Sequence, residues 1–212
     1  MKNARVLSCV MALGAGGLAW ADLIIPLDGG WQATVLGDSV ADLGVDFVGE
    51  DLLVLEKFAD FWEIDPVTGA PAPIAILFEQ VAPDEETLSR IAITDEVVLN
   101  HTGLTWVDFH IKLLGPQVMW NPEDSADFSY DPFGVMEFSE DLHSVDFSEG
   151  SIEDGGMWTP GLASGALYID VDLSPVDPVS FVLKELPTIP GPWGMVVLGI
   201  GWLGLPGRRA RD

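Results

Sequence analysis

Side chains that could bind a cation are concentrated between residues 120 and 156, where Asp and Glu are frequent and Lys and Arg are absent. Asn121, Glu123, Asp124 and Asp127 fall within one short part of this stretch. Calcium prefers several oxygen ligands at roughly 2.3–2.6 Å, so these four residues are the predicted calcium site. Asp170 and Asp172 are weaker candidates, because a spacing of two is also expected on the exposed face of a strand. A hydrated acidic surface without specific metal sites is the alternative interpretation.

Sequence patterns of known catalytic sites are not found. The chain has no Gly-x-Ser-x-Gly elbow, no phosphate-binding loop and no dinucleotide fingerprint. His101, His110 and His143 are not closely spaced, so they favour surface positions over a zinc site. Pairs of carboxylates are too frequent in this chain to indicate a glycosidase. We therefore predict no catalytic residues, no enzymatic activity and no cofactor other than calcium.

The charge of the chain limits its partners. Its 34 Asp and Glu residues against 9 Lys and Arg give a net charge of −25. Such a surface repels the phosphate backbone, which excludes nucleic acid as a partner. Sugars are compatible with it, and Trp106, Trp120 and Trp158 could stack on sugar rings. Packing of these tryptophans in the core or at its rim is the favoured interpretation.

The first 21 residues have the three parts of a secretory signal peptide. Lys2 and Arg5 precede an apolar run, and Ala19 and Ala21 provide small side chains in front of Asp22. We expect a signal peptidase to cleave between Ala21 and Asp22. The one cysteine, Cys9, lies in this segment, so the mature chain is predicted to have neither a disulfide nor a catalytic thiol.

The last 25 residues, 188–212, combine prolines, an apolar segment and a basic end. Pro190, Gly191 and Pro192 precede the uncharged run 193–205, and Arg208, Arg209 and Arg211 follow it. As a helix the run would reach only about 20 Å at about 1.5 Å per residue, which is short of a hydrocarbon core roughly 30 Å thick. This pattern predicts a short hydrophobic helix that holds the protein temporarily at the inner membrane. A permanent single-pass anchor is the alternative.

This tail resembles the PEP-CTERM sorting signal, in which a Pro-Glu-Pro motif, a hydrophobic segment and an Arg-rich end are processed by the transpeptidase exosortase. Pro190 and Pro192 match the motif prolines, whereas Gly191 stands where the family usually has glutamate. The residues 97–114 and 181–188 also look like parts of secreted bodies that carry such tails. The resemblance implies export, transfer to the cell surface or an exopolysaccharide matrix, and an uncharacterised extracellular β domain.

Between the two terminal segments, residues 22–187 are predicted to form one all-β domain, an antiparallel β-sandwich or jelly roll. Short apolar runs bounded by Gly, Asp or Pro are typical of this class. Alternation predicts a hairpin of 91–99 and 107–113, and it predicts that 167–173 turns through 175–178 into a final strand at 179–186. The remaining predicted elements are strands at 33–36, 45–48, 52–62, 74–81, 135–138 and 144–147, and one helical turn at 83–87.

These observations predict a secreted surface or matrix protein with a structural or interaction role. The alternative is a calcium-dependent carbohydrate-binding module at the cell surface, in which the acidic stretch and the tryptophans form the site.

Overall fold

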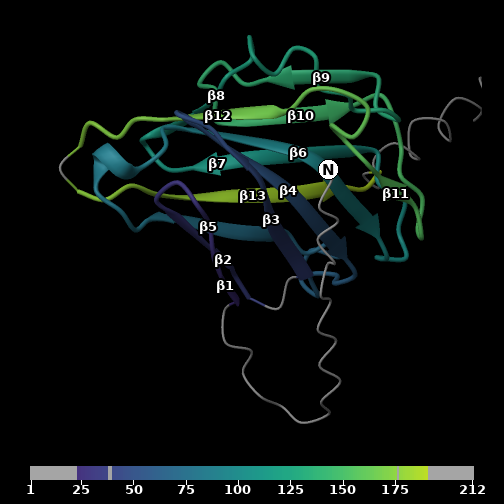
Figure 1. Cartoon of the computed structure of the whole chain (residues 1–212). Coiled ribbons are helices and arrows are strands. Elements are labelled where there is room, and N and C mark those ends of the chain that lie inside the picture. The colour runs from purple at the N-terminus through teal and green to yellow at the C-terminus, as the bar shows by residue number, and fades with distance from the viewer. Residues whose placement is uncertain (1–22, 38–39, 176, 191–212) are drawn as a thin grey trace, which may run out of the picture.

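The computed structural model describes residues 23–37, 40–175 and 177–190, and this part of the chain is almost entirely β-structure (Figure 1). Its strands form two sheets. The first has the order β1 (Leu23–Pro26), β2 (Trp31–Val35), β5 (Ile74–Gln80), β13 (Ser180–Thr188), β7 (Asp108–Leu114), β10 (Ser144–Ser148) and β9 (Val135–Phe138). The second has the order β3 (Val40–Val48), β4 (Leu52–Phe61), β6 (Arg90–Asn100), β12 (Leu167–Val171) and β8 (Val118–Trp120), and β11 (Met157–Trp158) also pairs with β6.

One hydrophobic core is shared by the two sheets. Side chains alternate in burial along β4 and β13, because successive residues of a strand point to opposite faces. Aromatic contacts cross between the sheets: the ring of Phe61 on β4 packs edge-on against Phe109 on β7 at 5.8 Å between centroids. In Figure 1, β3 and β4 cross the strands of the other sheet at an angle. The arrangement confirms the all-β prediction and agrees with a sandwich.

Most predicted strands are confirmed. The stretch 52–62, whose apolar spacing also fits a helix, is the strand β4 as predicted, and 135–138 and 144–147 correspond to β9 and β10. The predicted helical turn is the 3-10 turn η1 (Asp84–Glu86). The short strands β1, β8 and β11 were not predicted. Among the described strands every pairing is antiparallel except β4 with β6, which is parallel and corrects the purely antiparallel prediction.

The predicted hairpin of 91–99 and 107–113 is wrong. β6 and β7 lie in different sheets, so the residues between them cross from one sheet to the other. Asn100 is fully buried there, and its side-chain amide donates to the carbonyls of Leu104 at 2.8 Å and Ile152 at 3.0 Å. Thr102 joins the same network and accepts a hydrogen bond from Trp106 Nε1 at 3.2 Å. These bonds stabilise an arch between the sheets.

The turn predicted at 175–178 also connects different sheets, since β12 and β13 do not pair. Alternation along 91–99 predicts that Ile91, Ile93, Val97 and Leu99 share one face. In β6 Val98 is buried instead, whereas Val97 and Leu99 are only partly so. The pairing of β4 with β6 shifts register between Glu56 and Phe58, and such an irregularity changes which side chains of a strand face inward.

Several predictions lie outside the described residues. These are the signal peptide, with Ala19, Ala21 and Asp22, and the sorting segment from Gly191 onward, with Pro192, Arg208, Arg209, Arg211 and the hydrophobic helix. Pro190 is described and is exposed just after the end of β13. No helix within the described ranges has the length and apolar character needed to span a membrane.

Candidate functional site

Three charged side chains meet in the interior between the sheets: Lys57 on β4, Glu96 on β6 and Glu185 on β13. We call them the buried ion cluster. Lys57 Nζ lies 2.6 Å from Glu96 Oε1 and 2.8 Å from Glu185 Oε1, and all three side chains are at most 1% exposed. Apart from these contacts, no hydrogen-bond partner is found for the oxygens of either carboxylate within the described residues. The cluster is therefore a fully buried group of two acids and one amine.

Burial and mutual repulsion determine the charge of the cluster. Burial raises the pKa of Glu185 well above its usual value, and the neighbouring Glu96 carboxylate raises it further, while Lys57 opposes both effects. Burial alone would lower the pKa of Lys57, but attraction by Glu185 and Glu96 outweighs it and raises the pKa. Both shifts favour the protonated forms, which are a Lys57 ammonium and a neutral Glu185 carboxyl.

The sequence prediction did not identify this cluster, although a signal for it was present. On β4, Lys57 follows Leu53 and Leu55 at intervals of two and precedes Ala59 and Phe61, which are all buried. On β13, Glu185 continues the buried series of Phe181 and Leu183. Side chains two residues apart in a strand point to the same face, so a charged residue at this spacing among buried residues must be buried too. A buried charge then needs a partner.

The predicted calcium residues lie together only in part. Asn121 lies beside Asp170, and its Nδ2 donates to Asp170 Oδ2 at 2.8 Å. Asp124 is linked to the same group through Arg90. The guanidinium of Arg90 occupies the space between the acids: it contacts Asp124 Oδ2 and lies 3.1 Å from Asp170 Oδ1. Asn121 Oδ1 accepts the backbone N–H of Asp124 at 3.1 Å. The cation bound here is thus an arginine side chain.

Glu123 and Asp127 are exposed and do not contribute to this network. Asp172 is also exposed, and its Oδ1 accepts the backbone N–H of Ser174 at 2.9 Å. No group of three or more His, Cys, Asp or Glu side chains is arranged to hold a metal ion in the ranges that the structure covers. The calcium prediction therefore has no ligand cluster to support it in this part of the chain.

The three tryptophans considered for sugar stacking are core residues. Trp106 and Trp120 are completely buried, and Trp158 is 1% exposed, which confirms the packing interpretation. Trp62, which directly follows β4, is the one tryptophan with an exposed side chain among the described residues, at 51%. Near it, His101 Nδ1 lies 2.8 Å from Asp60 Oδ1. Trp62 is the aromatic surface that the sequence prediction missed.

The histidines have structural partners. His110 Nδ1 lies 2.6 Å from Asp146 Oδ1, across the pairing of β7 with β10. His143 lies 2.7 Å from the carbonyl of Asp141 and 3.2 Å from that of Gly115. His101, in the arch between the sheets, is half exposed. The prediction of surface positions agrees with these contacts.

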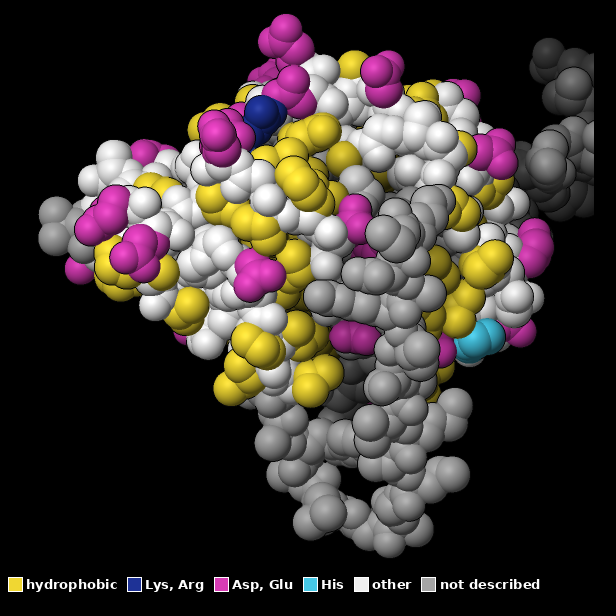
Figure 2. Space-filling view, viewed as in Figure 1, with side chains coloured by type: hydrophobic (Ala, Val, Ile, Leu, Met, Phe, Trp, Pro, Cys, Tyr) yellow, Lys and Arg dark blue, Asp and Glu magenta, His cyan; other side chains and the backbone are white. Residues whose placement is uncertain are grey.

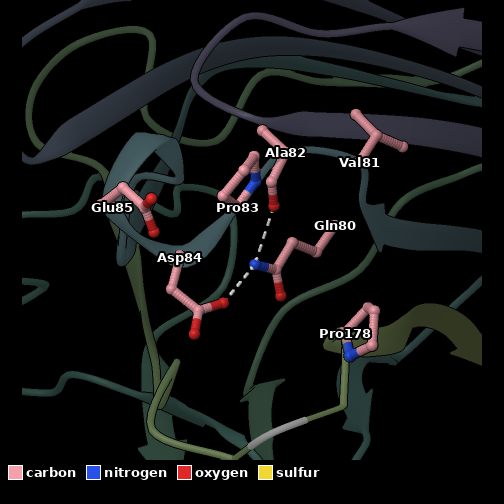
Figure 3. A pocket seen from close by; sticks show the side chains of 7 residues that line it. All are labelled: Gln80, Val81, Ala82, Pro83, Asp84, Glu85 and Pro178. Atoms are coloured by element: carbon pink, nitrogen blue, oxygen red, sulfur yellow. Dashed lines mark hydrogen bonds between the residues drawn. The ribbon is translucent and has the colours of Figure 1, made fainter.

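A hollow lies between the end of β5 and the start of β13, with a volume of about 420 Å³ (Figure 3). The side chain of Gln80 points into it and donates to Ala82 O at 3.0 Å and to Asp84 Oδ1 at 2.7 Å. Gln80 Oε1 accepts the backbone N–H of Val179 at 2.9 Å. These bonds connect the loop after β5 to the start of β13, and the Glu85 carboxylate also lines the hollow.

The outer surface is strongly acidic. Figure 2 shows Asp and Glu side chains scattered over the visible face, with apolar side chains between them and few basic ones. Of the nine Lys and Arg residues, four lie between residues 22 and 187: Lys57, Arg90, Lys112 and Lys184. Since Lys57 is buried and Arg90 is paired with Asp124 and Asp170, little positive charge remains at the surface.

The chain matches no protein-family model, no curated protein and no solved structure. Its function is therefore inferred from its own sequence and geometry.

Proposed function

We propose that the chain is an exported protein with a structural or interaction role at the cell surface or in an exopolysaccharide matrix. The body is a β-sandwich of the jelly-roll type, without a catalytic role. A signal peptidase removes residues 1–21. The sorting segment 188–212 holds the protein at the inner membrane until an exosortase-type transpeptidase processes it.

The observation that supports this proposal is the point in the sequence at which the described fold ends. β13 ends at Thr188, and Pro190 is exposed two residues later, directly before Gly191 and Pro192. A processing enzyme needs its recognition motif in an accessible backbone outside the folded body. The uncharged run and the arginines beyond it agree with the tripartite signal. The acidic surface is suited to a hydrated extracellular matrix, since net charge keeps proteins soluble and apart.

The proposal is tested on the native protein by fractionation and by mass spectrometry of both ends. We expect a chain in the surface or extracellular fraction that begins at Asp22 and has lost the residues after the Pro190-Gly191-Pro192 motif. Replacing Arg208, Arg209 and Arg211 together with Gln should leave the tail uncut and retain the protein at the membrane. A cytosolic protein with both ends intact would refute the proposal.

A carbohydrate-binding module is the second candidate, and the exposure of Trp62 favours it. An exposed tryptophan can stack on a sugar ring, and the His101–Asp60 pair beside it offers polar contacts. Calorimetry of the purified protein with extracellular polysaccharides, with and without calcium, tests this role. Saturable heat that is lost in Trp62→Ala supports the module. Equal heats for Trp62→Ala and the parent protein exclude Trp62 as the sugar site.

A further inference from the structure

The buried ion cluster has the composition of a reacting group. An amine and two carboxyl groups lie within contact distance, and they come from three strands and from both sheets. We propose that Lys57 and Glu185 become joined by an intramolecular amide bond, with Glu96 as the proton-transfer residue. The bond would connect β4 of one sheet to β13 of the other.

Burial and contact reduce the two obstacles that prevent this condensation in water. In solution, amine and acid ionise, and bulk water drives the equilibrium toward hydrolysis. Inside the protein, burial favours the neutral form of the Glu185 carboxyl, and the Glu96 carboxylate lies 2.6 Å from Lys57 Nζ, where it can take a proton from the ammonium. Groups held in reacting position behave as if present at roughly 10⁵–10⁸ M. Lys57 Nζ lies 2.8 Å from Glu185 Oε1, so the amine and the carboxyl group are already in contact.

The reaction balances within the three side chains. The Lys57 ammonium passes one proton to the Glu96 carboxylate, which leaves a neutral amine. Its lone pair attacks the carboxyl carbon of Glu185, and the nitrogen then passes a second proton to the hydroxyl on that carbon. The C–N bond forms, the C–OH bond breaks, and the hydroxyl leaves as water after taking up a proton. The products are a neutral amide, one water molecule and a Glu96 that retains one proton.

Glu185 is assigned as the electrophile because it is the carboxyl that keeps a proton. A carboxylate anion resists attack by an amine, whereas a neutral carboxyl accepts it. Burial first, and then the repulsion by Glu96, favour the neutral form of Glu185. Glu96 lies closer to the amine, at 2.6 Å, and is therefore well placed to accept its proton.

The amide would reinforce the strand that carries the sorting segment. Glu185 lies three residues before the end of β13, so tension applied through the tail would enter the fold beside it. A covalent bond to β4 would transfer that tension to the opposite sheet. This mechanical use rests on the proposed function, whereas the formation of the amide depends only on the contacts in the core.

Mass spectrometry of the purified full-length chain tests the amide directly. We expect the folded protein to be lighter by one water molecule than its sequence requires, after allowance for processing at its ends. Trypsin should fail to cleave after the acylated Lys57 but should cleave after Lys184. Fragmentation should then show the peptide that contains Lys57 joined to the peptide that begins with Glu185.

Three variants assign the roles. Lys57→Arg keeps the charge but should show no loss of water, and Glu96→Gln should slow amide formation by roughly 10²–10⁴-fold, as expected for loss of a general base. Lys112→Arg replaces an exposed lysine on β7 and should retain the loss of water. A wild-type chain of full mass, with complete cleavage after Lys57, overturns the proposal whether or not any variant folds. A bond from Lys57 to Glu96 overturns the assignment of Glu185.

The two proposals fail separately. An exported and sorted protein that lacks the amide would refute the amide alone. A cytosolic protein with both ends uncut that contains the amide would refute the proposed function alone.

Discussion

Lys57 on β4 and Glu185 on β13 lie in different sheets, and Lys57 Nζ is 2.8 Å from Glu185 Oε1 in the centre of the core. Lys57 belongs to a buried strand face whose other members are apolar. A buried ion pair commonly contributes little to net stability, because removing two charges from water offsets their attraction. The contact is therefore expected to contribute little to net stability, and its main consequence is the reaction that it permits.

Amide formation should depend on pH through Glu185. The raised pKa of Glu185 reflects burial and the nearby Glu96 carboxylate, so this carboxyl stays protonated above the usual range. As pH rises through that raised pKa, the electrophilic neutral form disappears. Before the bond forms, the raised pKa of Glu185 also affects folding stability. Its contribution to the free energy of unfolding is present at low pH and is lost as the pH rises through that raised pKa. We expect the cross-linked fraction to fall as pH increases.

This pH dependence can be measured on chains that are folded from urea, in which the amide has not yet formed. The unfolded protein is diluted into buffers of increasing pH, and the loss of water is followed by mass. Glu96→Gln serves as the control, because its slow reaction sets the background. A yield that rises steadily with pH would contradict the role of a protonated Glu185.

Removing Lys57 alone should be more damaging than removing the whole cluster. Lys57→Met leaves Glu96 and Glu185 facing each other without a cation, and breaking a buried pair in this way costs about 3–5 kcal/mol. Replacing all three residues with Met or Leu removes every buried charge and should recover most of that loss. Neither variant can form the amide, so the difference between their urea midpoints measures charge burial alone. Equal midpoints would show that the charges do not matter.

The sequence predicted strands well because alternation follows directly from burial of one face. The ranges 107–113 and 167–173, which were predicted from alternation, correspond to the strands β7 and β12, and both alternate in burial. The connection between β6 and β7 was not predictable, since Asn-His-Thr-Gly suits a hairpin and an arch equally. Only the burial of Asn100, with its bonds to Leu104 and Ile152, distinguishes them.

The candidate sites were harder to predict, because their members are distant in sequence. Asn121 and Asp124 are neighbours and suggested a metal site, but their cation, Arg90, is 34 residues from Asp124. In the buried ion cluster, the three members come from three different strands. The alternation within β4 and β13 is a signal that Lys57 and Glu185 face inward, which the prediction did not use, whereas their contact depends on how the two sheets pack.

Arg90 should contribute modestly to stability. It contacts Asp124 and Asp170 at partly exposed positions, and its guanidinium lies 5.1 Å from the ring centre of Tyr168. Exposed ion pairs contribute about 0.2–1 kcal/mol each, and so does a cation–π contact of this kind. We expect Arg90→Gln to lower the free energy of unfolding by about 1 kcal/mol, less at high salt. Lys112→Gln, at an exposed position, should change it by less than about 0.5 kcal/mol.

The same variant tests the calcium prediction. If the guanidinium occupies the place of a cation, Arg90→Gln releases the carboxylates of Asp124 and Asp170, and weak calcium binding should appear in calorimetry. The parent protein should show no saturable heat from this loop. Saturable binding by the parent that is lost in Asp124→Asn would restore the calcium site.

Gly165 and Gly155 form a matched pair for testing how the acidic loop is held. Both have φ of +74°, so an alanine at either position should cost about 1 kcal/mol of backbone strain. A Cβ at Gly155 would meet nothing within 4 Å, whereas at Gly165 it would lie 2.5 Å from the carbonyl carbon and oxygen of Asp127. The backbone of 127–128 would have to move, which also strains the hydrogen bond from Ser164 Oγ to Asp127 O.

We therefore expect Gly155→Ala to lower the free energy of unfolding by about 1 kcal/mol and Gly165→Ala to lower it by roughly 3 kcal/mol or more. Urea unfolding of both variants gives the comparison, and subtracting the first loss from the second isolates the effect of the close approach. Since Phe128, next to Asp127, is 3% exposed in the core, the larger loss should be accompanied by a change in near-UV dichroism. Equal losses for the two variants would mean that the loop shifts at no cost, and that Gly165 does not hold it in place.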